Sequence, residues 1–142
     1  MHRHSSILKQ RTRGRLNVEK LTYGLIGCGR IAPNHITAAM NNADALEVVA
    51  LCDPVREHAE RILSFLPEEK RASVRLYEDY REMLRDGAPT LVSIATESGK
   101  HASIGLDCLD AGCNVIIEKP IALSMDDARA LVSKAKEKNV KL

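Results

Sequence analysis

The chain has 142 residues, of which 44% are hydrophobic and 28% are charged, and these proportions are ordinary for one globular domain. Aromatic residues make up only 3% and Trp is absent, which argues against the exposed rings on which single-stranded nucleic acids stack. The net charge of +2 is unevenly distributed, because six of the first 20 residues are Lys or Arg and only Glu19 is acidic. The rest of the chain therefore carries a small negative net charge, which argues against a nucleic-acid partner.

Residues 1–20 are predicted to be a basic, disordered extension. They contain no apolar run of the kind found in a secretory signal, which argues against that class. An Arg-rich, acid-poor start is also typical of an organelle presequence, and the sequence leaves this alternative open.

From residue 21 onward, short apolar runs alternate with helical patterns. The first four predicted elements are a strand over 21–27, a helix over 30–42, a strand over 46–53 and a helix over 54–66. Pro54 stands at the start of the second helix, where its missing N–H group is tolerated.

The alternation continues to the end of the chain, with predicted strands over 73–77, 90–96 and 114–119 and helices over 78–87, 99–112 and 124–139. Ser124 is the expected N-cap of the last helix. Residues 140–142 have the pattern of the first half of a sixth strand, truncated at the C-terminus. This order predicts an α/β fold over 21–142 with a doubly wound parallel sheet, the Rossmann dinucleotide-binding fold.

The four cysteines form no C-x-x-C pair, which indicates neither a disulfide framework nor a zinc site and fits a reducing, cytoplasmic setting. His2 and His4 are too few for a metal site, so no metal is predicted. No apolar run approaches the roughly 20 residues that a membrane-spanning helix needs, so no membrane partner is expected either.

The turn after the first strand has the pattern Gly27-x-Gly29-x-x-Ala32. Gly27 permits a tight turn, Gly29 lets the backbone approach a pyrophosphate, and Ala32 lets the following helix pack closely on the sheet. The N-terminus of that helix offers free N–H groups to phosphates. A tight turn without any ligand is the alternative interpretation.

Asp53 ends the second predicted strand, where a carboxylate can accept hydrogen bonds from the adenosine ribose and repel a 2′-phosphate. This position favours NAD over NADP. Arg56 follows three residues later and could reach a 2′-phosphate, so NADP stays possible.

Glu118 and Lys119 end the fifth predicted strand, on the edge of the sheet where ligands of open α/β folds bind. A lysine in such a crevice can take part in proton transfer to or from a substrate hydroxyl. Taken alone, a Glu-Lys pair at a strand end is more often part of a solvated loop.

Together, the Gly27–Ala32 turn, Asp53, Thr96 at the end of the fourth strand and the Glu118–Pro120 motif resemble the Gfo/Idh/MocA oxidoreductases, the relatives of glucose–fructose oxidoreductase and inositol dehydrogenase. The resemblance covers roughly residues 20–142. It implies a dehydrogenase domain for NAD, with NADP possible, in which Lys119 lies beside the nicotinamide and the substrate hydroxyl as the catalytic residue. The cofactor-binding residues that it implies are Gly27, Gly29, Arg30, Ile31, Asp53, Thr96, His101, Glu118 and Lys119.

The chain departs from the family in two respects. Many members have Pro-Asn after the fourth strand where this chain has Glu97-Ser98, although His101 matches a family histidine; a surface position for His101 is the alternative. Members continue into a second domain, which supplies the substrate pocket and most of an oligomer interface and which this chain is expected to lack. The resemblance therefore implies a homo-oligomer only for a full-length form.

The predicted function is cofactor binding by a dehydrogenase whose small-molecule substrate is a sugar, a polyol or a nucleotide-linked sugar. The "IAPNH" stretch over 31–35 resembles members that act on nucleotide-linked amino sugars and their uronates. A non-catalytic dinucleotide sensor would keep Gly27, Gly29 and Asp53 but give Lys119 no chemical role. A methyltransferase-type domain would explain the first strand and Asp53 but leave Glu118–Pro120 unexplained.

Overall fold

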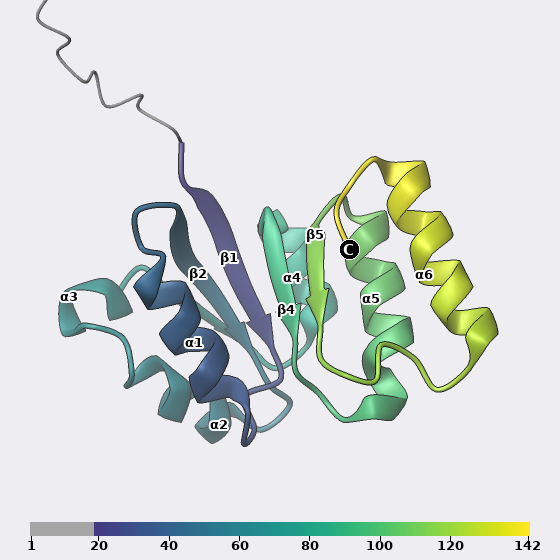
Figure 1. The fold of residues 1–142 in the computed structure, drawn as a ribbon. Coiled ribbons are helices and arrows are strands. Elements are labelled where there is room, and N and C mark those ends of the chain that lie inside the picture. The colour runs from purple at the N-terminus through teal and green to yellow at the C-terminus, as the bar shows by residue number, and fades with distance from the viewer. Residues whose placement is uncertain (1–18) are drawn as a thin grey trace, which may run out of the picture.

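The computed structural model describes residues 19–142 and contains one parallel sheet (Figure 1). Its strands are β1 (Leu21–Ile26), β2 (Leu46–Cys52), β3 (Arg75–Tyr77), β4 (Leu91–Ile94) and β5 (Asn114–Ile117). They lie in the order β3-β2-β1-β4-β5, so the direction of winding reverses between β1 and β4. The predicted doubly wound fold is confirmed, and this reversal places a ligand crevice beyond the carboxyl ends of β1 and β4.

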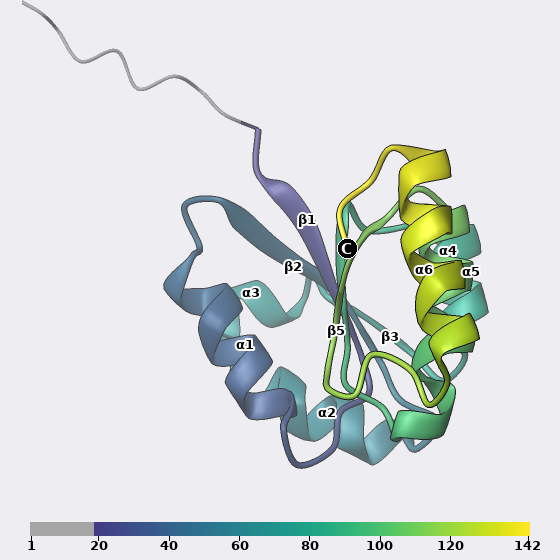
Figure 2. The same ribbon diagram turned by 45° about the vertical axis from the view of Figure 1, so that its right-hand side comes forward.

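Helices cover both faces of the sheet (Figure 2). One face carries α1 (Ala32–Asn41), α2 (Arg56–Leu63) and α3 (Glu68–Arg71). The other carries α4 (Tyr80–Gly87), α5 (His101–Asp110), which follows the short 3₁₀ turn Ser98–Lys100, and α6 (Met125–Lys138). This arrangement is what right-handed crossovers between parallel strands require.

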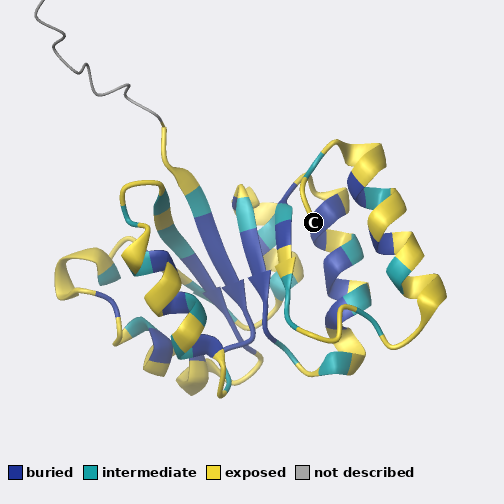
Figure 3. Ribbon diagram, in the orientation of Figure 1, coloured by how far each residue is buried: buried dark blue, intermediate teal, exposed yellow. Residues whose placement is uncertain are grey.

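Two apolar clusters, one on each face, hold the layers together (Figure 3). Leu25 and Ile36 belong to the cluster between the sheet and α1, and both are fully buried. Ile94, Leu109 and Leu131 belong to the cluster beneath α4, α5 and α6. Burial on both faces explains why the central strands are continuous apolar runs in the sequence.

Local signals fix the ends of several helices. The Ser124 side chain accepts a hydrogen bond of 3.1 Å from the Asp127 N–H group and caps α6, as the sequence predicts. The Asp79 side chain caps α4 in the same way, accepting from the Arg81 N–H group at 2.8 Å. These caps satisfy N–H groups that have no partner within the helix.

The structure differs from the sequence-based prediction in two places. Helix α3 was not predicted; it has one turn and buries none of its residues, so it leaves no apolar periodicity in the sequence. Residues 140–142 form no strand, but the Lys141 carbonyl accepts a hydrogen bond of 2.9 Å from the Val115 N–H group of β5. The segment therefore lies along the outer edge of β5, near the C-terminus marked in Figure 1.

Most of the basic extension predicted over 1–20, including His2 and His4, lies outside the described residues. Among residues 19–142, no helix combines the length and apolar character that crossing a membrane requires.

Candidate dinucleotide-binding site

A cleft of about 790 Å³ opens at the carboxyl edge of the sheet, at the reversal between β1 and β4. Its walls include Gly27 and Gly29 after β1, Asp53 after β2 and Thr96 after β4. Four residues that the sequence assigns to the cofactor thus line one cavity.

The turn after β1 uses its two glycines for different reasons. Gly27 has a φ of +94°, and a Cβ atom there would lie 2.5 Å from the Ala95 carbonyl oxygen at the end of β4. Gly29 has no such backbone strain, and a Cβ atom there would meet no protein atom within 4 Å. Packing therefore requires a glycine at position 27, whereas the space at Gly29 is open on the cleft side and fits a ligand that approaches the backbone closely.

Helix α1 starts directly behind this turn. Ala32 is fully buried against the sheet, and Arg30 and Ile31 are exposed at the helix end. No side chain caps α1, and its first turn contains no acidic residue. The positive end of the helix dipole is therefore not compensated by a side chain. The Ala32 and Asn34 N–H groups donate to the Gly29 and Ile31 carbonyl oxygens at 3.3 and 3.0 Å, and Pro33 has no N–H group, so an anion would meet the backbone of the preceding turn.

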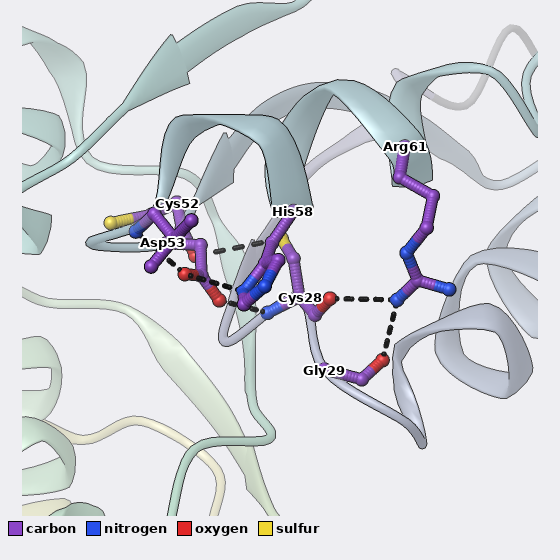
Figure 4. A network of polar contacts seen from close by, with 7 residues as sticks. Cys28, Gly29, Cys52, Asp53, His58 and Arg61 are labelled. Carbon is purple, nitrogen blue, oxygen red and sulfur yellow. Dashed lines mark hydrogen bonds and ion pairs between the residues drawn. The ribbon is translucent and has the colours of Figure 1, made fainter.

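Asp53 holds the turn from the neighbouring strand (Figure 4). The carboxylate is 8% exposed; its Oδ2 accepts a hydrogen bond of 2.9 Å from the Cys28 N–H group, and its Oδ1 accepts one of 2.9 Å from Val55. The His58 Nδ1 atom of α2 lies 3.2 Å from the same Oδ1 atom. A carboxylate has about four acceptor positions, so a ribose hydroxyl can bind at the remaining position or replace the half-exposed imidazole.

Arg61 of α2 contacts the turn, and sequence reasoning missed it. Its guanidinium, from α2, donates to the carbonyl oxygens of Cys28 and Gly29 at 3.0 and 3.1 Å (Figure 4). It thereby holds those carbonyl groups in place and adds positive charge beside the turn. The helical pattern of 54–66 puts Arg61 on α2, but only the packing of α2 against the turn reveals the contact.

Charged residues of both signs line the rest of the cleft. Glu78 and Asp79 lie there with Asp53, but Arg81 contacts Asp79 at 3.8 Å, and Lys100 contacts Glu97 at 2.7 Å. Arg56, the candidate partner for a 2′-phosphate, is paired instead with Glu60 on the same helix at 3.1 Å.

Glu118 and Lys119 follow β5, beyond the walls of this cleft. The Glu118 N–H group donates to the Ile94 carbonyl at 3.0 Å, which ties the segment to the end of β4. The Glu118 Oε1 atom lies 2.8 Å from the His35 Nε2 atom of α1, and this hydrogen bond is the main cause of a lowered Glu118 pKa. The Lys119 side chain is exposed.

His101 is only 1% exposed, so the surface interpretation is wrong. Its Nε2 atom lies 2.9 Å from the Thr96 carbonyl oxygen and its Nδ1 atom lies 2.7 Å from the Pro120 carbonyl oxygen. Both ring nitrogens thus face protein atoms. His101 joins the end of β4 to the segment after Lys119 and does not line the cleft.

The sequence-based set is therefore divided between the cleft and the β5 end. Gly27, Gly29, Asp53 and Thr96 lie around the cleft, while Glu118 and Lys119 lie at the end of β5. His35 connects α1 to the β5 end through Glu118. Among the described residues, no three side chains from His, Cys, Asp or Glu gather as metal ligands would.

Comparison with known proteins agrees with this geometry. Residues 21–142 match the family model described as an oxidoreductase family with an NAD-binding Rossmann fold. Inositol 2-dehydrogenase of Salmonella typhimurium is 30% identical over 121 residues, covering 85% of this chain and 34% of that protein. D-Apiose dehydrogenase of Paraburkholderia graminis is 35% identical over 125 residues, covering 88% of this chain and 32% of that protein.

Among solved structures, the WlbA dehydrogenase of Bordetella pertussis in complex with NADH and UDP-GlcNAcA matches with a TM-score of 0.77 and 31% identity. The match covers 86% of this chain and 36% of that one. GenD2 from gentamicin A biosynthesis, in complex with NAD, matches with a TM-score of 0.76 and 26% identity, covering 87% and 33%. The chain thus spans about a third of the length of the relatives that it matches.

Proposed function

The chain belongs to the Gfo/Idh/MocA oxidoreductase family with its NAD-binding Rossmann fold, and from this we propose that residues 21–142 are the cofactor domain of a dehydrogenase. The substrate class that we propose is a sugar, a polyol or a nucleotide-linked sugar with a secondary alcohol. The observation that carries the proposal is the open space at Gly29, between the uncapped end of α1 and the Asp53 carboxylate.

The pyrophosphate and the adenosine ribose each have candidate partners. Gly27, Gly29, Arg30 and Ile31 would form the turn that holds the pyrophosphate at the positive end of α1, which no side chain caps. Asp53 would accept from the adenosine ribose. Gly29 is the residue whose missing side chain makes room.

The charges in the cleft favour NAD over NADP. A 2′-phosphate at the ribose would approach the Asp53 carboxylate, and Glu78 lines the same cleft. Arg56, the cation that could compensate, forms an exposed pair with Glu60. Like charges close together in a partly desolvated cleft repel by kcal/mol amounts.

A fluorescence titration of the 142-residue chain with NADH and NADPH tests this preference. We expect NADH to bind at least about tenfold more tightly, which corresponds to 1.4 kcal/mol. Asp53→Asn keeps an oxygen for the Cys28 N–H group but removes the charge, so the preference should shrink. Glu57→Gln removes the same charge from α2 outside the cleft and should leave it unchanged. Tighter binding of NADPH by the unmodified chain would contradict the assignment.

For the chemical step we propose that Lys119 holds or moves the proton of the substrate hydroxyl. When bound, NAD supplies the hydride acceptor. The chain's own contribution is orientation: the bond from Glu118 to Ile94 fixes the Lys119 segment against β4, the strand that ends at the cleft. Thr96 would then face the cofactor from the end of β4.

The exposed position of Lys119 outside the cleft walls favours a second candidate, a dinucleotide sensor without chemistry. Lys119→Met in the longest natural form of the protein separates the two. If Lys119 transfers the proton, its replacement should lower kcat by about 10²- to 10⁴-fold. Unchanged turnover would contradict the chemical role of Lys119, and the absence of any turnover in the unmodified longest form would support the sensor. For the 142-residue chain alone we expect cofactor binding with little or no turnover.

We also propose a cytoplasmic setting and a homo-oligomer for a full-length form. All four cysteines are free thiols and buried, which suits a reducing compartment. Mass measurement by light scattering on the longest form tests the oligomer, and a monomer there would contradict it. Fractionation of the source cells tests the setting.

A further inference from the structure

Two histidines bind the residues on either side of Lys119. Glu118 precedes it and contacts His35, while Pro120 follows it and contacts His101. His35 belongs to α1 and His101 to α5, which cover opposite faces of the sheet (Figure 2). The segment that carries the lysine is thus held from both helix layers.

The contact from α1 fixes one oxygen of the Glu118 carboxylate, and the Lys119 backbone contacts the other. Oε1 lies 2.8 Å from the His35 Nε2 atom, and Oε2 accepts a hydrogen bond of 3.3 Å from the Lys119 N–H group. The side chains are 14% and 29% exposed, so little water competes for the bond. His35 therefore reaches the Lys119 backbone through one intervening carboxylate.

The contact from α5 is made by a fully buried ring between two carbonyl groups. The Nδ1 atom of His101 faces Pro120 at 2.7 Å and its Nε2 atom faces Thr96 at 2.9 Å. A neutral imidazole donates only one of these bonds, and an imidazolium donates both. Either way, the ring connects the end of β4 to the residue after Lys119.

Packing alone does not account for these two side chains. A polar group that is removed from water costs free energy unless it is hydrogen-bonded, and an aliphatic residue would fill the same space without that requirement. The two rings are instead satisfied by the residues that flank Lys119. In addition, His35 lies one turn into α1, whose N-terminus faces the proposed pyrophosphate site.

We propose that His35 and His101 are positioning residues that hold the segment Glu118–Pro120 between α1 and α5 and so fix the Lys119 amine relative to the bound dinucleotide. The inference rests on the proposed function, in which Lys119 lies beside the nicotinamide. The proposal gives α1 two roles. Its N-terminal end would bind the phosphates, and its residue His35 would orient Lys119.

The test follows the Lys119 amine directly. Reductive methylation with ¹³C-formaldehyde gives each lysine of the 142-residue chain a dimethylamine NMR signal, and the Lys119→Arg variant identifies the signal of Lys119. Addition of NAD⁺ should shift this signal, because an aromatic nicotinamide ring would lie beside it. The Lys134 signal serves as an internal reference, since Lys134 lies on α6 and pairs with Asp110.

His35→Leu should at least halve the NAD⁺-induced shift of Lys119 while the NAD⁺ affinity stays within about threefold of the unmodified chain. His35→Gln should restore the shift, since its amide N–H occupies the place of the ring Nε2 atom. Thr37→Ala, an exposed change on α1, is the matched control. A purely structural role would lower affinity and shift together and would not be rescued by Gln.

Two amide substitutions of His101 test its role. His101→Asn keeps a donor near the Nδ1 position, toward Pro120, and should retain the shift. His101→Gln keeps one near the Nε2 position, toward Thr96, and should lose it. The reverse order would remove His101 from the proposal. If neither variant folds, the His35 series decides the proposal alone.

The outcomes separate the inference from the proposed function. An unchanged Lys119 shift in His35→Leu overturns the positioning role while leaving NAD binding intact. Binding of NAD⁺ without any Lys119 shift in the unmodified chain contradicts the catalytic assignment, and the positioning role falls with it. Failure of the chain to bind NAD⁺ at all contradicts the proposed function itself.

Discussion

Substituting each glycine of the β1–α1 turn by alanine should separate the fold from the ligand site. At position 27 the backbone φ is +94°, and the new Cβ atom would lie 2.5 Å from the Ala95 carbonyl oxygen. At position 29 the backbone is unstrained and the new Cβ atom would meet no protein atom within 4 Å. Gly27→Ala should therefore lower the stability of the protein, whereas Gly29→Ala should mainly weaken the binding of a ligand in the cleft.

The free energies follow from these two environments. The left-handed backbone costs a non-glycine residue roughly 1–2 kcal/mol. Moving the end of β4 away from the clash adds about 1–3 kcal/mol, the range of overpacked cores. Gly27→Ala should thus lower the free energy of unfolding by about 2–5 kcal/mol, a large part of the total for a single domain. Gly29→Ala should change it by no more than about 1 kcal/mol, in the stabilising direction.

Urea denaturation followed by circular dichroism measures the stabilities, and an NADH fluorescence titration measures binding. Gly29→Ala should fold normally and bind NADH at least about tenfold more weakly, because its methyl group occupies the space proposed for the pyrophosphate. Normal NADH binding by Gly29→Ala would refute the placement of the pyrophosphate. A Gly27→Ala protein as stable as the unmodified chain would refute the reasoning about the turn.

Three further predictions concern the rest of the fold. Leu131→Ala in α6 removes a fully buried side chain, and urea denaturation should show a loss of about 2–5 kcal/mol. Burial raises the pKa of both Cys28 and Cys52 to about 12, so the native thiols should resist Ellman's reagent at neutral pH and react once the chain is unfolded in urea. The lowered Glu118 pKa, due first to the His35 bond, stabilises the fold above the ordinary value of 4.5, and this contribution is lost as the pH falls through the folded pKa. The stability difference between the unmodified chain and His35→Leu should therefore shrink as the pH falls below 4.5.

The sequence was sufficient for the architecture because each layer leaves its own periodic signal. The strands are buried on both faces, so they appear as continuous apolar runs, and Ser124 marks the start of α6 in the sequence as it does in space. Helix α3 escaped prediction because none of its residues is buried. The parallel order of strands then followed from the handedness of the crossovers.

The site was predictable where a backbone requirement dictates the residue. Gly27 and Gly29 follow a strand, and Asp53 ends the next one, so the topology brings them together without any knowledge of side-chain packing. Arg61 and His35 carry no such signal, because their partners are a carbonyl oxygen and a carboxylate that only the packing of α2 and α1 brings within reach. A helical pattern tells which side of a helix faces the sheet, but not which turn it faces.

The contacts of Asp53 and Arg61 show why the cleft needs little rearrangement to receive an anion. The carboxylate binds an N–H group of the turn, and the guanidinium binds two of its carbonyl groups, so opposite charges hold the same few backbone atoms from two sides. Ordering a flexible turn at the moment of binding would cost conformational entropy, whereas a turn already fixed by the protein costs little. In the proposed site, the residues around the turn would therefore contribute to cofactor affinity by two routes: through the contacts they offer to the ligand, and through the order they impose before it arrives.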